Sequence, residues 1–560
     1  MTKRRDGLNV FALLAIASLI VSACQSSPGT TEQNPASDVD PNGAITLNTG
    51  TEPNTIDPQK ANFTDEVGIS AQVFEGLMTF DSATTKAIPA AAAEQPKWDA
   101  AKLTYTYTLK EGLKYSDGTP LTAKNFEYGF KRGCDPALVA DYAFVLYVLV
   151  GCEEWNSMDP KKATPAELDA AKANVGVKAT DGKTLVFTLK EAAAYFVPIS
   201  ALWIGWPVRE SDVTKGGDTW TEPATYIGNG SLKLTEWKHN EKLVLERNDN
   251  ARKKVQFKTL TFVMIQEANV AFAAYGNNEL DITSVTAGDL RTVEGDPDLS
   301  KQVVNTPGSC SVYYGFNVLR PPFDDVNIRL AFAKSFDREA FIKDVVKIGR
   351  AADGGFIAPG FPGYDNTDTV QKYDPAAAKA LLDKAAPASK AGLTDVKYTY
   401  GATAIGTRDA EWIQSQWKTN LGVNIQLDPV PANALSSLFK KGKDSPQAYG
   451  RRWCADFPDE QDWHSTVWAT GGSDAGRTGF SSKQFDDLTK QADKEPDPGK
   501  RSELYKQAGQ LLSREAPAAW LRYSAGKGVR KPWIKGIIDN PSDYGIPGYF
   551  SIEKIYVAKH

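Results

Sequence analysis

Apolar and polar residues follow a pattern that predicts short strands and helices along most of the chain. Residues 103–109 alternate strictly between an apolar residue and threonine, and they form the clearest predicted strand. Shorter strands are expected at residues 45–48, 185–189, 243–246, 260–265, 280–283, 396–400 and 423–427. The spacing of apolar residues predicts helices over 65–77, from the N-cap Thr122 to about 131, over 267–275 and over 409–421.

Two parts of this pattern read as strand–helix–strand units, at residues 260–283 and 396–427. Such units are typical of parallel or mixed sheets. We therefore expect two separate α/β sheets, with further strand-rich sequence between residues 80 and 205. The folded part, about 520 residues, is also too long for one hydrophobic core. Together these features predict an α/β protein with two lobes and a cleft.

The first 24 residues have the pattern of a secretory signal. Lys3, Arg4 and Arg5 precede an apolar run over 10–21, which is too short for a comfortable membrane span. The run ends in small residues before Cys24, as in bacterial lipoproteins, whose cysteine takes a lipid and becomes the new N-terminus. An ordinary signal peptide with a cysteine nearby is the alternative. Residues 24–42 are polar and lack apolar periodicity, so we expect a flexible tether.

The charge and composition are those of a globular protein without a nucleic-acid footprint. The formal charge is -5, and removal of residues 1–23, with three basic residues and Asp6, would make it -7. Charged residues make up 24% and hydrophobic residues 41% of the chain. We therefore expect no nucleic-acid partner.

Five cysteines in an exported chain indicate disulfides. If Cys24 carries lipid, the four that remain can form two disulfides in any of three pairings. They are Cys134, Cys152, Cys310 and Cys454. The sequence has no CxxC pair and only three histidines, far apart, so neither a metal site nor a cofactor is expected.

Catalytic motifs are missing, which predicts that the protein is not an enzyme. Residues 471–475 fail the GxSxG pattern at the last position, and residues 401–407 lack the lysine of a P-loop. Neither GxGxxG nor HExxH occurs. The rival class is an exported hydrolase that uses two carboxylates in a cleft, but the paired acids at 324–325 and 486–487 lie in polar stretches typical of a solvated surface.

A set of short segments carries a resemblance to a known family. In order, they are residues 52–58, 74–77, 115–123, 228–230 with 243–248, 322–326 with 337–338, 453–456 and 531–533. The ordered set resembles the bacterial extracellular solute-binding proteins of family 5, the peptide/nickel type, and most closely the oligopeptide-binding members. The resemblance runs from residue 45 to the C-terminus.

This resemblance implies a bilobal fold of the periplasmic-binding-protein type, with mixed sheets, three domains and a hinged cleft. Domain I would comprise 43–74, 206–309 and 526–560, domain II 75–205 and domain III 310–525. It implies an extracytoplasmic binding protein of an ABC importer that captures short peptides and delivers them to permease subunits with a cytoplasmic ATPase. The protein would be a monomer, held at the cell membrane by its lipid alone.

The resemblance also implies roles for particular residues. Asp456, the acid of the Trp-Cys-Ala-Asp segment, would hold the peptide's N-terminal ammonium, Trp453 would help to wall the site, and Tyr142 would line the cleft. The family's basic residues for the peptide C-terminus do not align cleanly, and Lys441, Arg451 and Arg452 are the nearby candidates.

In oligopeptide binders the positions of Cys310 and Cys454 are joined, which leaves Cys134 and Cys152 for the second disulfide. The natural ligand stays open. An oligosaccharide or another small solute is an alternative cargo for this fold. A lipoprotein that senses peptides without transport is another alternative.

Overall fold

The computed structural model describes residues 38–431, 434–439, 442–543 and 546–560. The chain divides into two units, residues 1–38 and 39–560, and only the second is described below. The predicted signal peptide, Cys24 and Lys441 lie outside the described residues. Within the predicted tether, Val39 forms a β-bridge with Ala558, and the amide of Asp40 donates to the Val557 carbonyl at 2.8 Å. The described end of the tether is therefore attached to the folded part.

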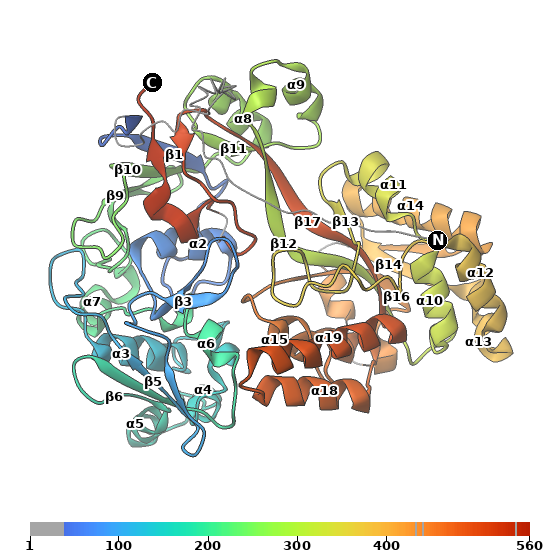
Figure 1. Cartoon of the computed structure of the whole chain (residues 1–560), viewed down its shortest axis with the longest axis horizontal. Helices are drawn as coiled ribbons and strands as arrows, with labels where there is room; N and C mark the ends of the chain where they lie inside the picture. Colours follow the sequence, from blue (N-terminus) through green and yellow to red (C-terminus); the bar gives the residue numbers. More distant parts are fainter. Residues whose placement is uncertain (1–37, 432–433, 440–441, 544–545) are drawn as a thin grey trace, which may run out of the picture. The chain divides into compact units, whose positions relative to one another are not determined.

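The largest sheet has 11 strands and runs through both lobes (Figure 1). Ten strands follow the order β15-β14-β16-β12-β17-β11-β1-β10-β9-β8, and β13 pairs with β17. Their bounds are β1 Ala44–Asn48, β8 Leu232–Lys238, β9 Lys242–Arg247, β10 Thr259–Val263, β11 Ile282–Ser284, β12 Val303–Phe316, β13 Arg350–Ala351, β14 Lys397–Gly401, β15 Gln426–Val430, β16 Ala448–Cys454 and β17 Ala518–Arg530. The prediction of two separate sheets is therefore wrong, because β12 and β17 join them.

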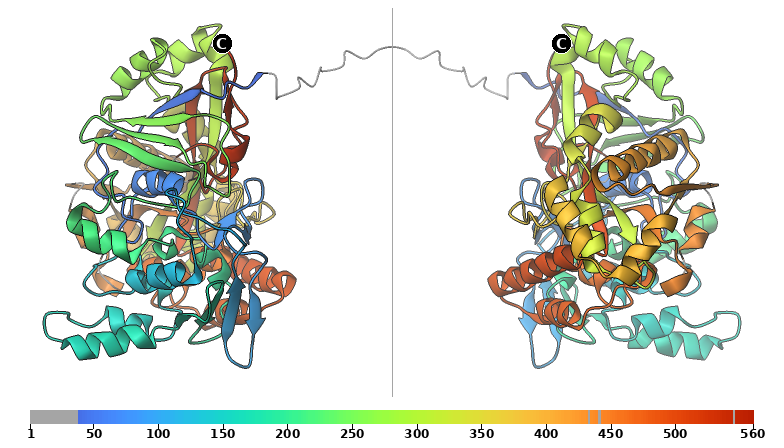
Figure 2. Two further views of the ribbon diagram at one scale, coloured as in Figure 1. Left: turned by 90° about the vertical axis from the view of Figure 1, so that its left-hand side faces the viewer. Right: turned by 90° about the vertical axis from the view of Figure 1, so that its right-hand side faces the viewer.

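The long strands β12 and β17 lie side by side and pass from one lobe to the other (Figures 1 and 2). Val303–Pro307 pairs with the stretch from Ala525 to Val529 beside β11, and β12 from Ser311 onward pairs with the first half of β17 beside β16. The register shifts between Pro307 and Ser311. The pairing of β12 with β17 is interrupted at this point, which separates the half of each strand in one lobe from the half in the other.

Both predicted strand–helix–strand units are present. Helix α8 (Ala268–Gly276) joins β10 to β11, and β1 lies between these strands, parallel to both. Helix α14 (Ala404–Leu421) joins β14 to β15, which are parallel neighbours. It begins earlier than predicted because the side chain of Thr403 accepts a hydrogen bond from the amide of Gly406 and caps its first turn.

A second sheet of four strands lies between β1 and β8 in the sequence, in the order β4-β5-β7-β6. Its bounds are β4 Lys97–Asp99, β5 Thr104–Thr108, β6 Val177–Ala179 and β7 Thr184–Thr188. β5 is the strictly alternating segment, and its two tyrosines are buried while its threonines are not. Helix α3 (Ala123–Gly133) follows Thr122 as predicted.

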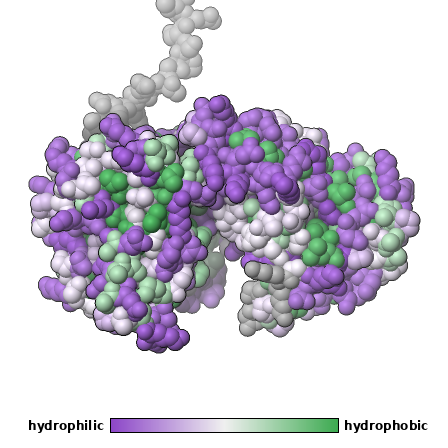
Figure 3. All heavy atoms as spheres, turned by 90° about the horizontal axis from the view of Figure 1, so that it is seen from below, coloured by the Kyte–Doolittle hydropathy of each residue, from purple (hydrophilic) through white to green (hydrophobic). Residues whose placement is uncertain are grey.

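The hydrophobic core is divided between the lobes. One large cluster joins side chains from residues 45–262 with Phe457 and others near the C-terminus, two clusters lie within residues 312–523, and a smaller one surrounds Tyr275 of α8. The other helices with at least seven residues are α2 Thr64–Val73, α5 Pro165–Asn174, α7 Glu210–Gly216, α10 Val326–Lys334, α12 Pro375–Lys384, α18 Lys483–Lys494 and α19 Pro498–Glu515. From below, the surface has a notch between the lobes (Figure 3). The bilobal α/β prediction is confirmed.

Among the described residues, no helix is both long and apolar enough to cross a membrane.

Candidate functional site

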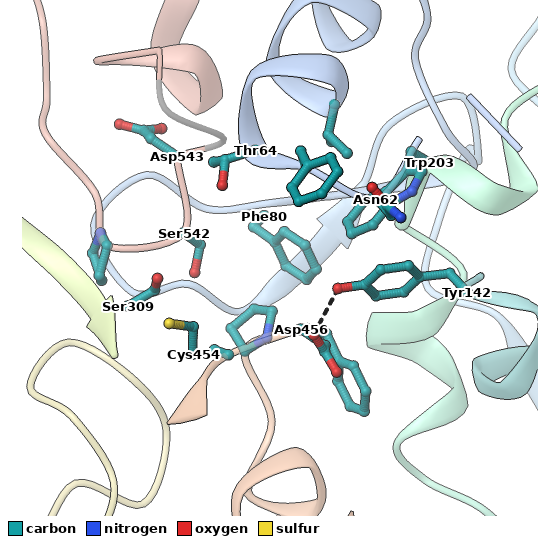
Figure 4. Close-up of a pocket in the computed structure, with 16 residues that line it drawn as sticks. Asn62, Thr64, Phe80, Tyr142, Trp203, Ser309, Cys454, Asp456, Ser542 and Asp543 are labelled. Atoms are coloured by element: carbon teal, nitrogen blue, oxygen red, sulfur yellow. Dashed lines mark hydrogen bonds between the residues drawn. The ribbon is translucent and has the colours of Figure 1, made fainter. Parts of the chain in front are cut away.

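A cavity of about 220 Å³ contains the predicted anchor Asp456 (Figure 4). Its wall combines segments that are far apart in the sequence and come from both lobes. The lining residues are Asn62, Phe63, Thr64, Val67, Phe80, Tyr142, Trp203, Ser309, residues 454–458 and residues 541–543. The start of α2 and the end of β16 thus face the same space.

Tyr142 and Asp456, both predicted site residues, are brought together. The Tyr142 hydroxyl donates a hydrogen bond to Asp456 Oδ1 at 2.8 Å (Figure 4). Asp456 lies two residues beyond the end of β16. The ring of Tyr142 packs edge-on against Trp203, with 4.9 Å between the centroids. Its neighbour Asp141 accepts a hydrogen bond from Asn62, which ties this segment to the start of α2.

The local environment disfavours ionisation of Asp456. Burial raises its pKa to about 6, although the hydrogen bond from Tyr142 lowers it. Burial also raises the pKa of Tyr142, and the charge of Asp456 adds to that shift. Tyr142 is therefore a neutral hydrogen-bond donor, and Asp456 is a carboxylate whose charge has little compensation.

Asp462 is a second carboxyl group behind Asp456 that sequence reasoning missed. It is fully buried in the short helix α15 (Glu460–Trp463). Its Oδ2 accepts hydrogen bonds from the Asp456 amide at 3.1 Å and from Trp453 Nε1 at 3.3 Å. Burial, and next the charge of Asp456, raise its pKa well above the usual range. The only signal in the sequence was its place in an acid-rich stretch after Asp456.

Trp453 takes a different position from the predicted one. It does not line the cavity, and its half-buried ring packs against the core cluster that contains Tyr313, Trp463 and Trp468. With its indole N–H bonded to Asp462, Trp453 supports the turn that carries Asp456.

The two predicted arginines lie on opposite faces of β16, because successive strand residues alternate. The Nε atom of Arg451 lies 3.4 Å from Oδ1 of Asp474, and the guanidinium group lies over the ring of Phe439. Arg452 is exposed. Neither lines the cavity around Asp456.

Arg522 of β17 joins Arg452 on the other face. Both pair with Val312 of β12, from its two sides, so their side chains share a face of the sheet. Arg522 Nε is buried and has no hydrogen-bond partner among the described residues. Burial lowers the pKa of Arg522, while the charge of Asp409 raises it. The cationic side chains of Arg452 and Arg522 thus lie on one face of the sheet, on either side of β12.

Part of β16 has an open edge. β14 pairs with β16 only at Ala448 and Tyr449, so in the described part of the chain no strand covers this side of Gly450–Cys454. On its other side, β16 is fully paired with β12 through Cys454. The open edge leads directly to Asp456, and such an edge is a template for another extended chain.

Both predicted disulfides are present. Cys310–Cys454 links β12 to β16 with 3.9 Å between the Cα atoms, and Cys454 lines the cavity. Cys134–Cys152 joins the end of α3 to the start of α4 (Cys152–Asn156). The first disulfide fixes the strand end that carries Asp456. Among the described residues, no group of three or more His, Cys, Asp or Glu side chains is placed to hold a metal ion.

The chain is similar in sequence and in fold to known binding proteins. The oligopeptide-binding protein OppA of Bacillus subtilis is 31% identical over 544 residues, which cover 95% of this chain and 96% of that protein. The unliganded open form of MppA, a periplasmic murein tripeptide binding protein, is similar in structure with a TM-score of 0.80, at 25% identity over 93% of this chain and 99% of MppA. The Haemophilus influenzae OppA complex with the peptide RPPGFSPFR has a TM-score of 0.68, at 23% identity over 93% of this chain and all of that one. Residues 86–475 match the model of the bacterial extracellular solute-binding proteins, family 5. The chain belongs to this family.

Proposed function

We propose that this chain is the extracytoplasmic substrate-binding lipoprotein of an ABC importer and that it captures short peptides at Asp456. The observation that carries the proposal is a half-buried carboxylate on a cavity wall, next to an open strand edge. The relatives named as oligopeptide-binding proteins support it. We do not propose catalysis at this cavity, because the sequence contains none of the four catalytic motifs named above.

Asp456 suits the N-terminal ammonium group of a peptide. An ammonium group has three donors and a full positive charge, and the charge of Asp456 has no ion-pair partner among the described residues. Closure of the site around the ligand would exclude water and strengthen this interaction. The amine would thus supply the charge that the empty site lacks.

The open edge of β16 suits the peptide backbone. In an extended peptide the main-chain groups pair with a strand edge whatever the side chains are, so affinity depends little on sequence. Peptide side chains would lie in hydrated space, where water adapts to each of them. Gly450–Cys454 provides this edge immediately before the anchor.

The basic residues suit the other end of the peptide. Arg452 lies four residues before Asp456, a span of about 13 Å along a strand. An extended chain of about four residues covers this distance. We propose Arg452 and Arg522 as partners of the C-terminal carboxylate, with Arg451 and Lys441 as further candidates. Arg451 is the weaker candidate, because it already lies beside Asp474.

The remaining parts of the proposal concern location and assembly. Cys24 would carry the lipid, and the monomer would deliver its peptide to permease subunits at the cell membrane. The division into domains at 43–74, 206–309 and 526–560, at 75–205, and at 310–525 is also proposed. The register shift between Pro307 and Ser311 lies at one of these boundaries.

Calorimetry with free and N-acetylated peptides of two to five residues tests the function. Asp456→Asn should weaken binding of free peptides by about 30-fold or more, since removal of one partner from such a pair costs about 2–5 kcal/mol. Acetylated peptides should bind poorly to the unchanged protein. Asp493→Asn is the matched control, because Asp493 is also half-buried with a pKa raised to about 6 but does not line the cavity.

Three results would contradict the proposal. Unchanged affinity in Asp456→Asn would remove this residue from the site, and equal binding of acetylated peptides would show that the amine is not recognised. Binding of oligosaccharides in place of peptides would favour the alternative cargo.

A further inference from the structure

Asp462 has an unusual position for a carboxyl group, because it is fully buried and only one of its two oxygens has hydrogen-bond partners among the described residues. Its Oδ2 accepts from the Asp456 amide and from Trp453 Nε1. Its Oδ1 is buried and has no hydrogen-bond partner among the described residues. Asp462 does not line the cavity, and it contacts the site through the hydrogen bond from the Asp456 amide. Buried polar atoms are nearly always paired, so the orphaned oxygen requires an explanation.

In the part of the chain that the structure describes, no cation is paired with either of the two carboxyl groups. Arg501 of α19 contacts the same turn, but its guanidinium bonds Asp459 at 2.9 Å and Glu460 at 3.4 Å. Among the described residues, neither Asp456 nor Asp462 forms an ion pair. The positive charge of Arg501 is therefore already shared by two other acids of the same turn.

Among the described residues, the other titratable groups of the cavity wall and of the neighbouring segments named here are neutral or acidic. Tyr142 donates to Asp456, and Asp141 precedes it. At the start of α2, Glu66 is buried and accepts from the amides of Asn62 and Phe63. Asp543, on another part of the cavity wall, accepts from backbone amides of its own loop (Figure 4). The buried His464 is held neutral, since burial lowers its pKa to about 3.

We propose that Asp462 is a positioning residue that makes peptide capture release a proton: Asp456 and Asp462 share one proton while the site is empty and lose it when a ligand's ammonium group binds. The proposal rests on the proposed function. In this step an O–H bond of one carboxyl group breaks, the proton passes to the solvent, and the ammonium group takes over its role as the compensating positive charge.

The electrostatics of the pair support this exchange. Burial and the neighbouring carboxylate raise the pKa of Asp462 well above its usual range, and burial raises that of Asp456 to about 6. An ammonium group next to Asp456 lowers the pKa of both groups, because opposite charges favour ionisation. Protons and peptides therefore compete for one site. The affinity for peptides should fall as the pH falls, by up to about tenfold for each pH unit.

The test is calorimetry with trialanine at pH 7 in several buffers that differ in ionisation enthalpy, because the buffer dependence of the heat counts released protons. The unchanged protein should release up to about one proton for each peptide bound. Asp462→Asn keeps the acceptor for both hydrogen bonds but cannot ionise, so it should bind trialanine without this release at pH 7. Asp462→Glu should restore the release, and Asp493→Asn should release as many protons as the unchanged protein.

Two outcomes would overturn the proposal while the proposed function stands. One is tight binding of trialanine by the unchanged protein with no proton release, a measurement that needs no variant. The other is an unchanged proton count in Asp462→Asn. If neither trialanine nor other free peptides bind at any pH, the proposed function itself fails, and this proposal fails with it.

Discussion

The hydroxyl of Tyr142 donates a 2.8 Å hydrogen bond to Asp456, a residue 314 positions later in the chain. This bond stabilises the ionised form of Asp456, while burial of the carboxyl group opposes ionisation more strongly and raises its pKa to about 6. The empty site thus keeps a carboxylate that costs stability at neutral pH. A ligand-binding residue of this kind trades stability for function.

Asp456→Asn should stabilise the protein in the absence of peptide at pH 7. The pKa of Asp456 is higher in the folded protein than in the unfolded chain, so between about pH 4 and pH 6 the folded state binds more protons. The free energy of unfolding therefore falls as the pH rises through this window. Removal of the charge should recover up to ~3 kcal/mol at pH 7. Thermal unfolding between pH 4 and pH 8 checks this.

Tyr142→Phe should act in the opposite direction and serves as the matched comparison. It removes a donor from the ionised carboxylate, which raises the pKa of Asp456 further and lowers stability at pH 7 by about 1–2 kcal/mol. A melting temperature of Asp456→Asn at or below that of the unchanged protein at pH 7 would contradict the assigned cause of the pKa shift.

Arg452 and Arg522 should recognise the free C-terminus of a peptide. Amidation of a tetrapeptide should weaken its binding to the unchanged protein by about tenfold or more, since hydrogen bonds to charged groups contribute about 1.5–3 kcal/mol. In a variant with Arg452→Ala and Arg522→Ala, free and amidated peptides should bind equally. Calorimetry with both forms measures the difference, and the exposed Arg514→Ala is the control. A double variant that still discriminates would exclude both arginines.

The sequence predicted most of the local elements but not the way in which they are joined. Alternation in residues 103–109 and the two strand–helix–strand units are local patterns, and β5, α8 and α14 appear where these patterns predict them. β12 was not predicted, because its first half contains Pro307 and Gly308 among polar residues and lacks regular alternation. Its strand conformation depends on pairing with β17, over 200 residues later.

The candidate site also combines residues that the sequence predicted with residues that it did not. Tyr142 and Asp456 were named through a resemblance in sequence, and the fold brings them into contact. Asp462 was missed, because its importance depends on a turn that brings it behind Asp456. Arg522 was missed as well, since only the strand register places it beside Arg452, across Val312. Contacts of this kind depend on tertiary structure and leave no local pattern.

Cys24 should be the N-terminus of the mature protein and should carry a lipid. The apolar run before Val21-Ser22-Ala23-Cys24 is the reason for this expectation. Intact mass spectrometry of the protein extracted from membranes should show loss of residues 1–23 and the added mass of the lipid. Cys24→Ser should abolish the added mass and release the protein from the membrane. An unmodified Cys24 in the membrane fraction would refute the prediction.

Peptide binding should bring the two lobes together by movement at β12 and β17. These strands are the hydrogen-bonded connection through the middle of the 11-stranded sheet, and their register shifts between Pro307 and Ser311. Because the ladder is interrupted there, a rotation at this point breaks few hydrogen bonds while each half stays paired with its own lobe. Closure of the notch seen in Figure 3 would narrow the cavity that Asp456 and the start of α2 line, and so enclose the ligand. Small-angle X-ray scattering should show a smaller radius of gyration when a bound tetrapeptide is present.

Asp456→Asn at the same peptide concentration is the control and should keep the radius of the empty protein. An unchanged radius at saturation, with binding proven by calorimetry, would show that the peptide is captured without movement of the lobes.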